Sequence, residues 1–258
     1  MPSAAPVLVQ PLRLAGPGDR RLVTGPLTAL HGWSSTRTPE GAIRFTSPCR
    51  TAALSMDGDG GSPVAWTVHG YTRPGAEPLW RASFSSGTPA EITAAFTTVL
   101  AAGLHSRHYD YPPGTPASVL AARGWVPDRE SRRGFHDQLS PDGWALYRHR
   151  LGHQPHEEEV AGLVPATWTM LAGTPRFPSW HAEFTAGVPF PPLVSAALAF
   201  SDPGPVLRPT GEVPTRHRAF VTVLRDSSGG RPPGPPRLAE ASAAHLPLSR
   251  PAPTARRR

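Results

Sequence analysis

Three histidines with glutamates directly after them form the group of residues that most resembles a metal site. They are His149, His153 and His156, followed by Glu157, Glu158 and Glu159. Zinc in proteins is bound by histidine nitrogens and carboxylate oxygens, so the residue types are suitable. A helix would place His153 and His156 on one face, but Pro155 between them resists a helix. The sequence therefore favours a solvated polar loop, and we predict no metal ligands here.

A second polar group consists of His105, His108 and Asp110, where an imidazole and a carboxylate are close enough in sequence to meet. In a hydrolase such a pair would activate a serine, but no serine occupies the Gly-x-Ser-x-Gly turn of those enzymes. An exposed linker is the better interpretation. Residues 57–61 resemble the start of a calcium loop, yet Val68 stands where the bidentate glutamate belongs. We expect a hairpin turn there.

The other reactive groups give no sign of catalysis. Cys49 is the only cysteine, which excludes an intrachain disulfide, and nothing local supplies a histidine to activate its thiol. The chain contains no lysine, so it cannot form the lysine-bearing phosphate loop, and it has no dinucleotide fingerprint. We therefore predict that the protein is not an enzyme and has no catalytic, cofactor-binding or metal-binding residues.

The tryptophans recur in pairs, and they indicate how the chain is organised. The block Trp80–Phe84 has the pattern W-x-A-x-F, which returns at Trp180–Phe184, and a proline follows each block. This alternation predicts two half-buried strands, each followed by a helix. Tryptophan can stack on bases or sugars, but the repeated alternation favours a role in the core. Six of the seven tryptophans form such pairs: Trp33 with Trp125, Trp66 with Trp168, and Trp80 with Trp180.

The repeat extends upstream of these strands. Each copy has a short helix ended by a Gly-Trp pair, then a Ser-Pro turn at Ser47 or Ser140 with apolar residues on both sides. We predict an α+β fold with two similar repeats, each made of a helix, a four-stranded antiparallel meander and a second helix. The second copy has about nine more residues around 152–163, which predicts a longer surface loop.

These patterns divide the chain into four segments: an N-terminal segment (1–16), repeat one with its linker (17–115), repeat two (116–202) and a tail (203–258). The N-terminal segment could add an edge strand to repeat one. The tail holds ten arginines and three acidic residues, which accounts for the whole formal charge of +7. It is rich in proline, so we predict disorder, except that 219–224 could form a strand or a hook for a partner.

The layout resembles the SPDY family, an actinobacterial domain of unknown function that often occurs twice in a chain. The resemblance covers roughly residues 5–202 and is carried by Ser140-Pro141-Asp142, the two Gly-Trp pairs and the two W-x-A-x-F blocks. The second copy has Gly143 where the family has tyrosine, and the first has Cys49 and Arg50 after its Ser-Pro pair. The resemblance implies a tandem domain from an actinobacterium, and it implies no activity.

No hydrophobic run approaches the length of a membrane helix, and the N-terminus lacks a signal core, so we expect a cytoplasmic protein without a membrane partner. Three functions remain open. The first is a non-enzymatic interaction module whose repeats present a surface to a protein. The second is a nucleic-acid-associated protein that uses its arginine-rich tail for weak, non-specific binding. The third is an enzyme with a cleft between the repeats.

Overall fold

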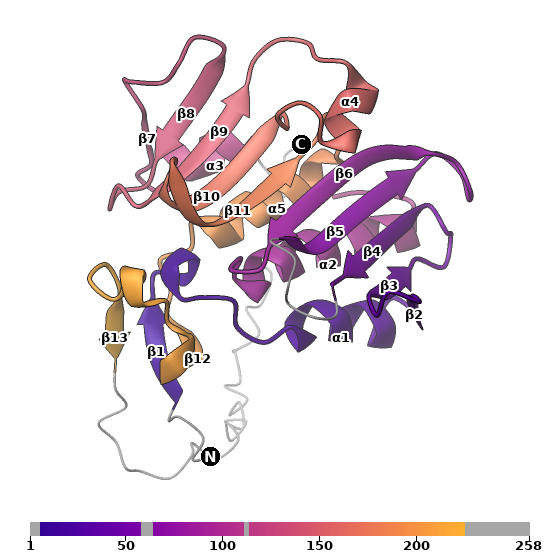
Figure 1. Ribbon diagram of the computed structural model, residues 1–258, viewed down its shortest axis with the longest axis horizontal. Coiled ribbons are helices and arrows are strands. Elements are labelled where there is room, and N and C mark those ends of the chain that lie inside the picture. Colours follow the sequence, from indigo (N-terminus) through magenta and orange to yellow (C-terminus); the bar gives the residue numbers. More distant parts are fainter. Residues whose placement is uncertain (1–5, 58–63, 111–113, 225–258) are drawn as a thin grey trace, which may run out of the picture. The chain divides into compact units, whose positions relative to one another are not determined.

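The computed structural model describes residues 6–57, 64–110 and 114–224, and its largest feature is a ten-stranded antiparallel sheet (Figure 1). One half of the sheet is a meander of five consecutive strands: β2 (Ser34–Arg37), β3 (Ile43–Thr46), β4 (Ala52–Met56), β5 (Val64–Tyr71) and β6 (Pro78–Ser85). The other half is a second meander: β7 (Val126–Pro127), β8 (Phe135–Leu139), β9 (Ala145–Arg150), β10 (Trp168–Thr174) and β11 (Phe177–Phe184). The last strand of each meander, β6 and β11, pair at the centre of the sheet.

Four helices cover one face of this sheet (Figure 1). They pack in the order α1 (Arg21–Ala29), α2 (Ala90–Ser106), α5 (Phe190–Phe200) and α3 (Pro116–Ala121). The central pair, α2 and α5, begins after Pro89 and Pro189, the prolines that follow the two W-x-A-x-F blocks. No helix among the described residues is both long enough and apolar enough to cross a membrane.

The alternation of the two blocks explains how the core forms. Trp80, Ala82 and Phe84 are buried toward the helices, as are Trp180, Ala182 and Phe184. Phe84, Phe96 of α2 and Phe184 form one aromatic group with ring centroids 5.5–5.7 Å apart, so the two halves share a single core. The prediction that these tryptophans anchor the core is confirmed for five of the six paired residues, and Trp168 is half-buried against it.

The junction of β6 and β11 carries a reciprocal pair of hydrogen bonds. The backbone N–H of Arg81 donates to Thr185 Oγ1 at 2.8 Å, and the N–H of His181 donates to Ser85 Oγ at 2.9 Å. The two bonds are equivalent. In each, a backbone amide of one strand donates to a hydroxyl at the C-terminal end of the partner strand.

A second, three-stranded sheet joins the two ends of the described chain. Its order is β12 (Val206–Pro209), β1 (Pro6–Gln10) and β13 (Thr222–Leu224), all antiparallel. Arg208 of β12 forms two hydrogen bonds with the carboxylate of Glu91 in α2, at 2.8 and 2.6 Å, which ties this sheet to the helix layer. Three short 3-10 helices complete the described fold: η1 (Leu12–Leu14), η2 (Thr210–Glu212) and η3 (Thr215–His217).

The mixed helix-and-sheet class is confirmed, but the finer prediction needs correction. Each meander has five strands rather than four, because the residues directly after each Gly-Trp pair form a further strand, β2 or β7. The two meanders form one continuous sheet. The insertion predicted to be a loop contains a helix, α4 (His156–Ala161), which packs beside β6.

The predictions for the two ends of the chain also need correction. β1 pairs with β12 and β13 and not with the first meander. The tail was predicted to be disordered from Pro203, but residues 206–224 form β12, η2, η3 and β13, because β1 supplies a pairing partner. Only the strand expected within 219–224 agrees, as β13. Residues 225–258 lie outside the described residues.

Candidate functional site

A buried arginine from the N-terminal segment is the starting point of the candidate site. Arg13 lies in η1 and only 5% of it is exposed to solvent. Hydrogen bonds from two distant parts of the chain, Trp180 and His217, hold its segment in place. The indole N–H of Trp180 donates to the Arg13 carbonyl at 2.8 Å, and His217 Nδ1 lies 2.8 Å from the Leu14 carbonyl. These contacts hold the Arg13 backbone, so its side chain projects from a fixed position.

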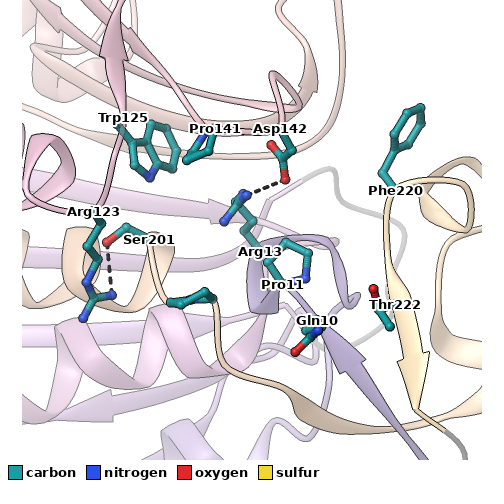
Figure 2. Close-up of a pocket in the computed structure, with 11 residues that line it drawn as sticks. Gln10, Pro11, Arg13, Arg123, Trp125, Pro141, Asp142, Ser201, Phe220 and Thr222 are labelled. Carbon is teal, nitrogen blue, oxygen red and sulfur yellow. Dashed lines mark hydrogen bonds and ion pairs between the residues drawn. The ribbon is translucent and has the colours of Figure 1, made fainter.

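The partner of Arg13 is Asp142, in the turn between β8 and β9. Its carboxylate forms an ion pair with the Arg13 guanidinium (Figure 2). Asp142 Oδ1 also accepts hydrogen bonds from Ser140 Oγ at 2.5 Å and from the Trp144 N–H at 3.0 Å. Asp142 therefore accepts the hydrogen bonds of its own turn and pairs with the buried guanidinium at the same time.

A cavity of about 670 Å³ opens beside this pair, and we name it the Arg13 cavity (Figure 2). Three parts of the chain meet around it: the end of β1, the turns and helix ends of the second half, and the segment from 201 to 222. Its lining residues are Gln10, Pro11, Arg13, Arg123, Trp125, Pro141, Asp142, Ser201, Pro203, Phe220 and Thr222.

Both aromatic and cationic residues line the Arg13 cavity. The guanidinium carbon of Arg13 lies 5.7 Å from the ring centroid of Trp125, within the range of a cation–π contact. Arg123 donates to the Leu198 carbonyl at 2.6 Å and to Ser201 Oγ at 3.2 Å, which ties it to the end of α5. Phe220 packs against Trp144 with ring centroids 3.8 Å apart and the rings tilted by 32°.

The electrostatics of the pair follow from burial and hydrogen bonding. Burial lowers the pKa of Arg13, and the charge of Asp142 works against that shift. For Asp142, burial opposes ionisation, but the hydrogen bonds from Ser140 and Trp144 and the charge of Arg13 outweigh it, so the pKa lies below its usual value. The pair is therefore ionised at neutral pH.

The arrangement is suited to binding. Asp142 and Ser201 are both engaged in hydrogen bonds within the protein, and no nucleophile with an adjacent base lines the Arg13 cavity. The exposed guanidinium of Arg123 and the ring of Phe220 remain accessible to a ligand, while Trp125, which is 3% exposed and packs against Phe200, forms part of the cavity wall.

The structure separates the predicted metal-like residues. His149 stacks on Trp168 with centroids 5.6 Å apart, while His156 begins α4 and Glu159 is buried. Burial, followed by the charges of His136 and Arg150, lowers the pKa of His149. The described part of the chain has no group of three or more His, Cys, Asp or Glu residues placed to hold a metal.

The other residues considered from the sequence lie at exposed positions. His108 and Asp110 lie 3.9 Å apart but are exposed, and His105 makes an edge contact with His31. Cys49 is exposed, with its sulfur 3.0 Å from Thr51 Oγ1; hydrogen bonds from Ser47 and Thr51 outweigh partial burial and lower its pKa. The calcium-like stretch falls mostly at 58–63, outside the described residues.

Sequence reasoning did not find the central residue of this site. Arg13 is one of many arginines, and it meets Asp142 across 129 residues of chain. The signal that was available is the Ser140-Pro141-Asp142 motif, which the family resemblance singled out without a role. Its aspartate now has one, as the partner of a buried arginine.

Comparisons with known proteins support the predicted family resemblance for one part of the chain. No curated protein and no solved structure matches the chain. The predicted family resemblance is confirmed over one segment, which runs from the end of β3 through β4, β5 and β6 to α2. The second half, including the Ser140-Pro141-Asp142 turn, lies outside the match. Residues 46–103 match the model of the SPDY family, a domain of unknown function (DUF317).

Proposed function

We propose that this chain is a non-enzymatic interaction module that binds a segment of a protein partner in the Arg13 cavity. The observation that carries the proposal is the lining itself: Trp125, Phe220 and two arginines surround a cavity of about 670 Å³. Tryptophan, aromatic residues and arginine are the types that supply most of the binding energy at protein interfaces.

The lining also indicates what the partner segment carries. Arg13 is neutralised by Asp142, so it acts as part of the wall. Arg123 has no carboxylate partner among the described residues, and its guanidinium is exposed. An acidic side chain near Arg123, next to an apolar or aromatic side chain against the exposed ring of Phe220, would complement both features.

The two halves of the molecule support a second part of the proposal, that they are copies of one SPDY-like module. Apart from α4, their elements follow the same order. Matched turns also share a backbone conformation: Arg50 and Gly143, three residues after the serine of each Ser-Pro pair, have φ angles of 59° and 72°. Gly32 and Gly124 both have positive φ and both face the proline of the Ser-Pro turn. Only in the second half does an aspartate follow that proline and meet Arg13.

A peptide selection on the full chain tests the binding proposal. We expect a displayed random peptide library to yield binders that combine acidic and aromatic residues. Their affinity should fall by about tenfold or more in Arg123→Glu and in Phe220→Ala. Arg129→Glu, an exposed position in the turn after β7, is the matched control and should bind like the wild type. Selected peptides that bind both cavity variants at full strength would place the interface elsewhere.

The nucleic-acid alternative stays a prediction, because most of the arginine-rich tail lies at 225–258, outside the described residues. The alternative of an enzyme with a cleft between the repeats also stays untested.

A further inference from the structure

A second cavity, of about 640 Å³, lies where α4 faces β5 and β6, and we name it the Arg81 cavity. It brings together the two halves of the chain, because α4 belongs to the second half and both strands to the first. None of its lining residues belongs to the Arg13 cavity.

The floor of the Arg81 cavity is set by strand register. His69 of β5 lies opposite Arg81 of β6, while their neighbours Val68, Trp80 and Ala82 are buried in the core beneath the helices. Because side chains alternate along a strand, His69 and Arg81 project from the face that the four helices leave uncovered. The bond from the Arg81 amide to Thr185 fixes the backbone at this position.

The wall formed by α4 is held in place by a buried glutamate. Glu159 is 1% exposed, and its Oε1 accepts hydrogen bonds from Thr167 N at 2.5 Å, Thr167 Oγ1 at 2.7 Å and Ala186 N at 3.2 Å. Arg150 lies 3.5 Å from the same oxygen. The helix ends at Gly162 in a left-handed conformation, and a Cβ there would lie 2.8 Å from Nη1 of Arg81. The Arg81 cavity is therefore preformed.

Within the described residues, none of the charged side chains that line the Arg81 cavity forms an ion pair. Every other described arginine that is not exposed lies within ion-pair distance of a carboxylate: Arg13, Arg148, Arg150 and Arg208. The guanidinium of Arg81 has no ion pair or hydrogen bond within the described residues, and its Nε is buried without a partner. Glu77 and Glu157 also line the cavity, and neither has an ion pair there.

A cationic side chain and two carboxylates line the Arg81 cavity without pairing with one another, so a ligand that carries both charges would complement them. We propose that the Arg81 cavity binds a free α-amino acid, with the carboxylate of the ligand on Arg81 and its ammonium group on Glu157 and Glu77. A charge-assisted hydrogen bond between arginine and a carboxylate is about twice as strong as one between neutral groups, and it would give the buried Nε of Arg81 a partner. His69 adds no competing charge, because burial and the charges of Arg81 and Arg44 lower its pKa.

Calorimetry and thermal unfolding of the full chain with each of the common α-amino acids test this inference. We expect at least one amino acid to bind and to raise the melting temperature. Its N-acetyl and carboxamide derivatives, which each remove one charge, should bind about tenfold more weakly or worse. Dipeptides distinguish a site for free amino acids from a site for peptide termini. Their two charged ends are farther apart than those of an amino acid, so dipeptides should not bind. Absence of binding by every amino acid would overturn the proposal, and so would equal binding by an N-acetyl derivative, which would indicate a simple carboxylate site.

Three variants locate the binding. Arg81→Gln should abolish it, and Glu157→Gln, an exposed position that leaves the core intact, should weaken it about tenfold or more. Glu158→Gln is the matched control on the same helix and should bind like the wild type. Binding that survives Glu157→Gln and Arg81→Gln would place the site elsewhere. The peptide selection on the Arg13 cavity is independent of these measurements, so either proposal can fail without the other.

Discussion

At the scale of residues, each buried arginine in the described part of the chain lies within ion-pair distance of a carboxylate. Removing a guanidinium from water is costly, and the cost is offset only where a carboxylate and further hydrogen bonds take the place of water. Asp142 does this for Arg13, Glu159 for Arg150, and Glu91 for Arg208. Removal of one of these carboxylates should therefore lower the free energy of unfolding by more than the loss of its own contacts, because it leaves a buried charge without a partner.

Asp142→Asn should therefore lower the free energy of unfolding by roughly 3 kcal/mol, because it leaves Arg13 buried and uncompensated. Urea denaturation of wild type and variant measures the difference. Asp19→Asn is the control, since Asp19 pairs with Arg21 at the surface and its loss should leave stability unchanged. An unaltered midpoint in Asp142→Asn would show that the pair contributes nothing net.

The same pair predicts a pH dependence. The folded pKa of Asp142 is lowered, so its contribution is present above the pKa of the unfolded chain and is lost as pH falls through the folded pKa. Stability of the wild type should decline on the acid side. In Asp142→Asn that decline should be smaller, as measured by denaturation at a series of acidic pH values. A parallel acid decline in both proteins would contradict the assignment.

Gly70 should not tolerate a side chain. It lies under Trp80, and a Cβ there would lie 2.1 Å from the indole ring, so Gly70→Ala should displace a core tryptophan and cost about 1–3 kcal/mol. Thermal denaturation of the variant measures this cost. A neutral Gly70→Ala would mean that Trp80 can move without loss.

At the scale of elements, α4 is the feature that distinguishes the two halves. It is a short helix of six residues, and such a helix is not stable by its own propensity. Its position depends on Glu159, whose carboxylate bonds to Thr167 and Ala186.

Glu159→Ala should therefore detach α4 while the sheet persists. We expect faster hydrogen exchange across 156–167 and a loss of roughly 3 kcal/mol, because Arg150 is left without its carboxylate. Glu158→Ala, one residue earlier and exposed, is the matched control. Unchanged exchange in α4 after Glu159→Ala would show that other contacts fix the helix.

Sequence periodicity predicted the elements that bury a regular face. The W-x-A-x-F blocks are β6 and β11, the following helices are α2 and α5, and the helices before the Gly-Trp pairs are α1 and α3. It missed β2, because Ser34–Arg37 is polar and fully exposed and forms a strand only by pairing with β3. It missed β12 for the same reason, since that strand depends on β1 from the opposite end of the chain.

The candidate sites were less predictable than the elements. Arg13 and Asp142 meet only because the N-terminal segment crosses to the second half, and Arg81 faces α4 only because β6 pairs with β11. Nothing periodic in the sequence encodes these long-range contacts. The histidines and glutamates near 149–159 stand out by their residue types, and they include Glu157 and Glu159. The sequence does not show that Glu159 meets Thr167 and Ala186, or that Glu157 lines a cavity with Arg81 of β6.

At the scale of the whole molecule, the two halves depend on each other. The β6–β11 pairing makes one sheet of ten strands, and α2 packs on α5 above it. Phe84 and Phe96 of the first half share their core with Phe184 of the second. Separated halves would expose these aromatic side chains to water, so neither half has a complete core alone.

The described fold should therefore unfold as one cooperative unit. Hydrogen exchange across a urea series should show the amides of β4 and β9, one strand from each half, losing protection at the same denaturant concentration. Trp80→Ala should cost roughly 3–5 kcal/mol and should lower both transitions together, although Trp80 lies in the first half only. If β9 kept its protection while β4 lost it, the halves would be independent domains joined by a weak strand pairing, and the shared aromatic core would contribute little to stability.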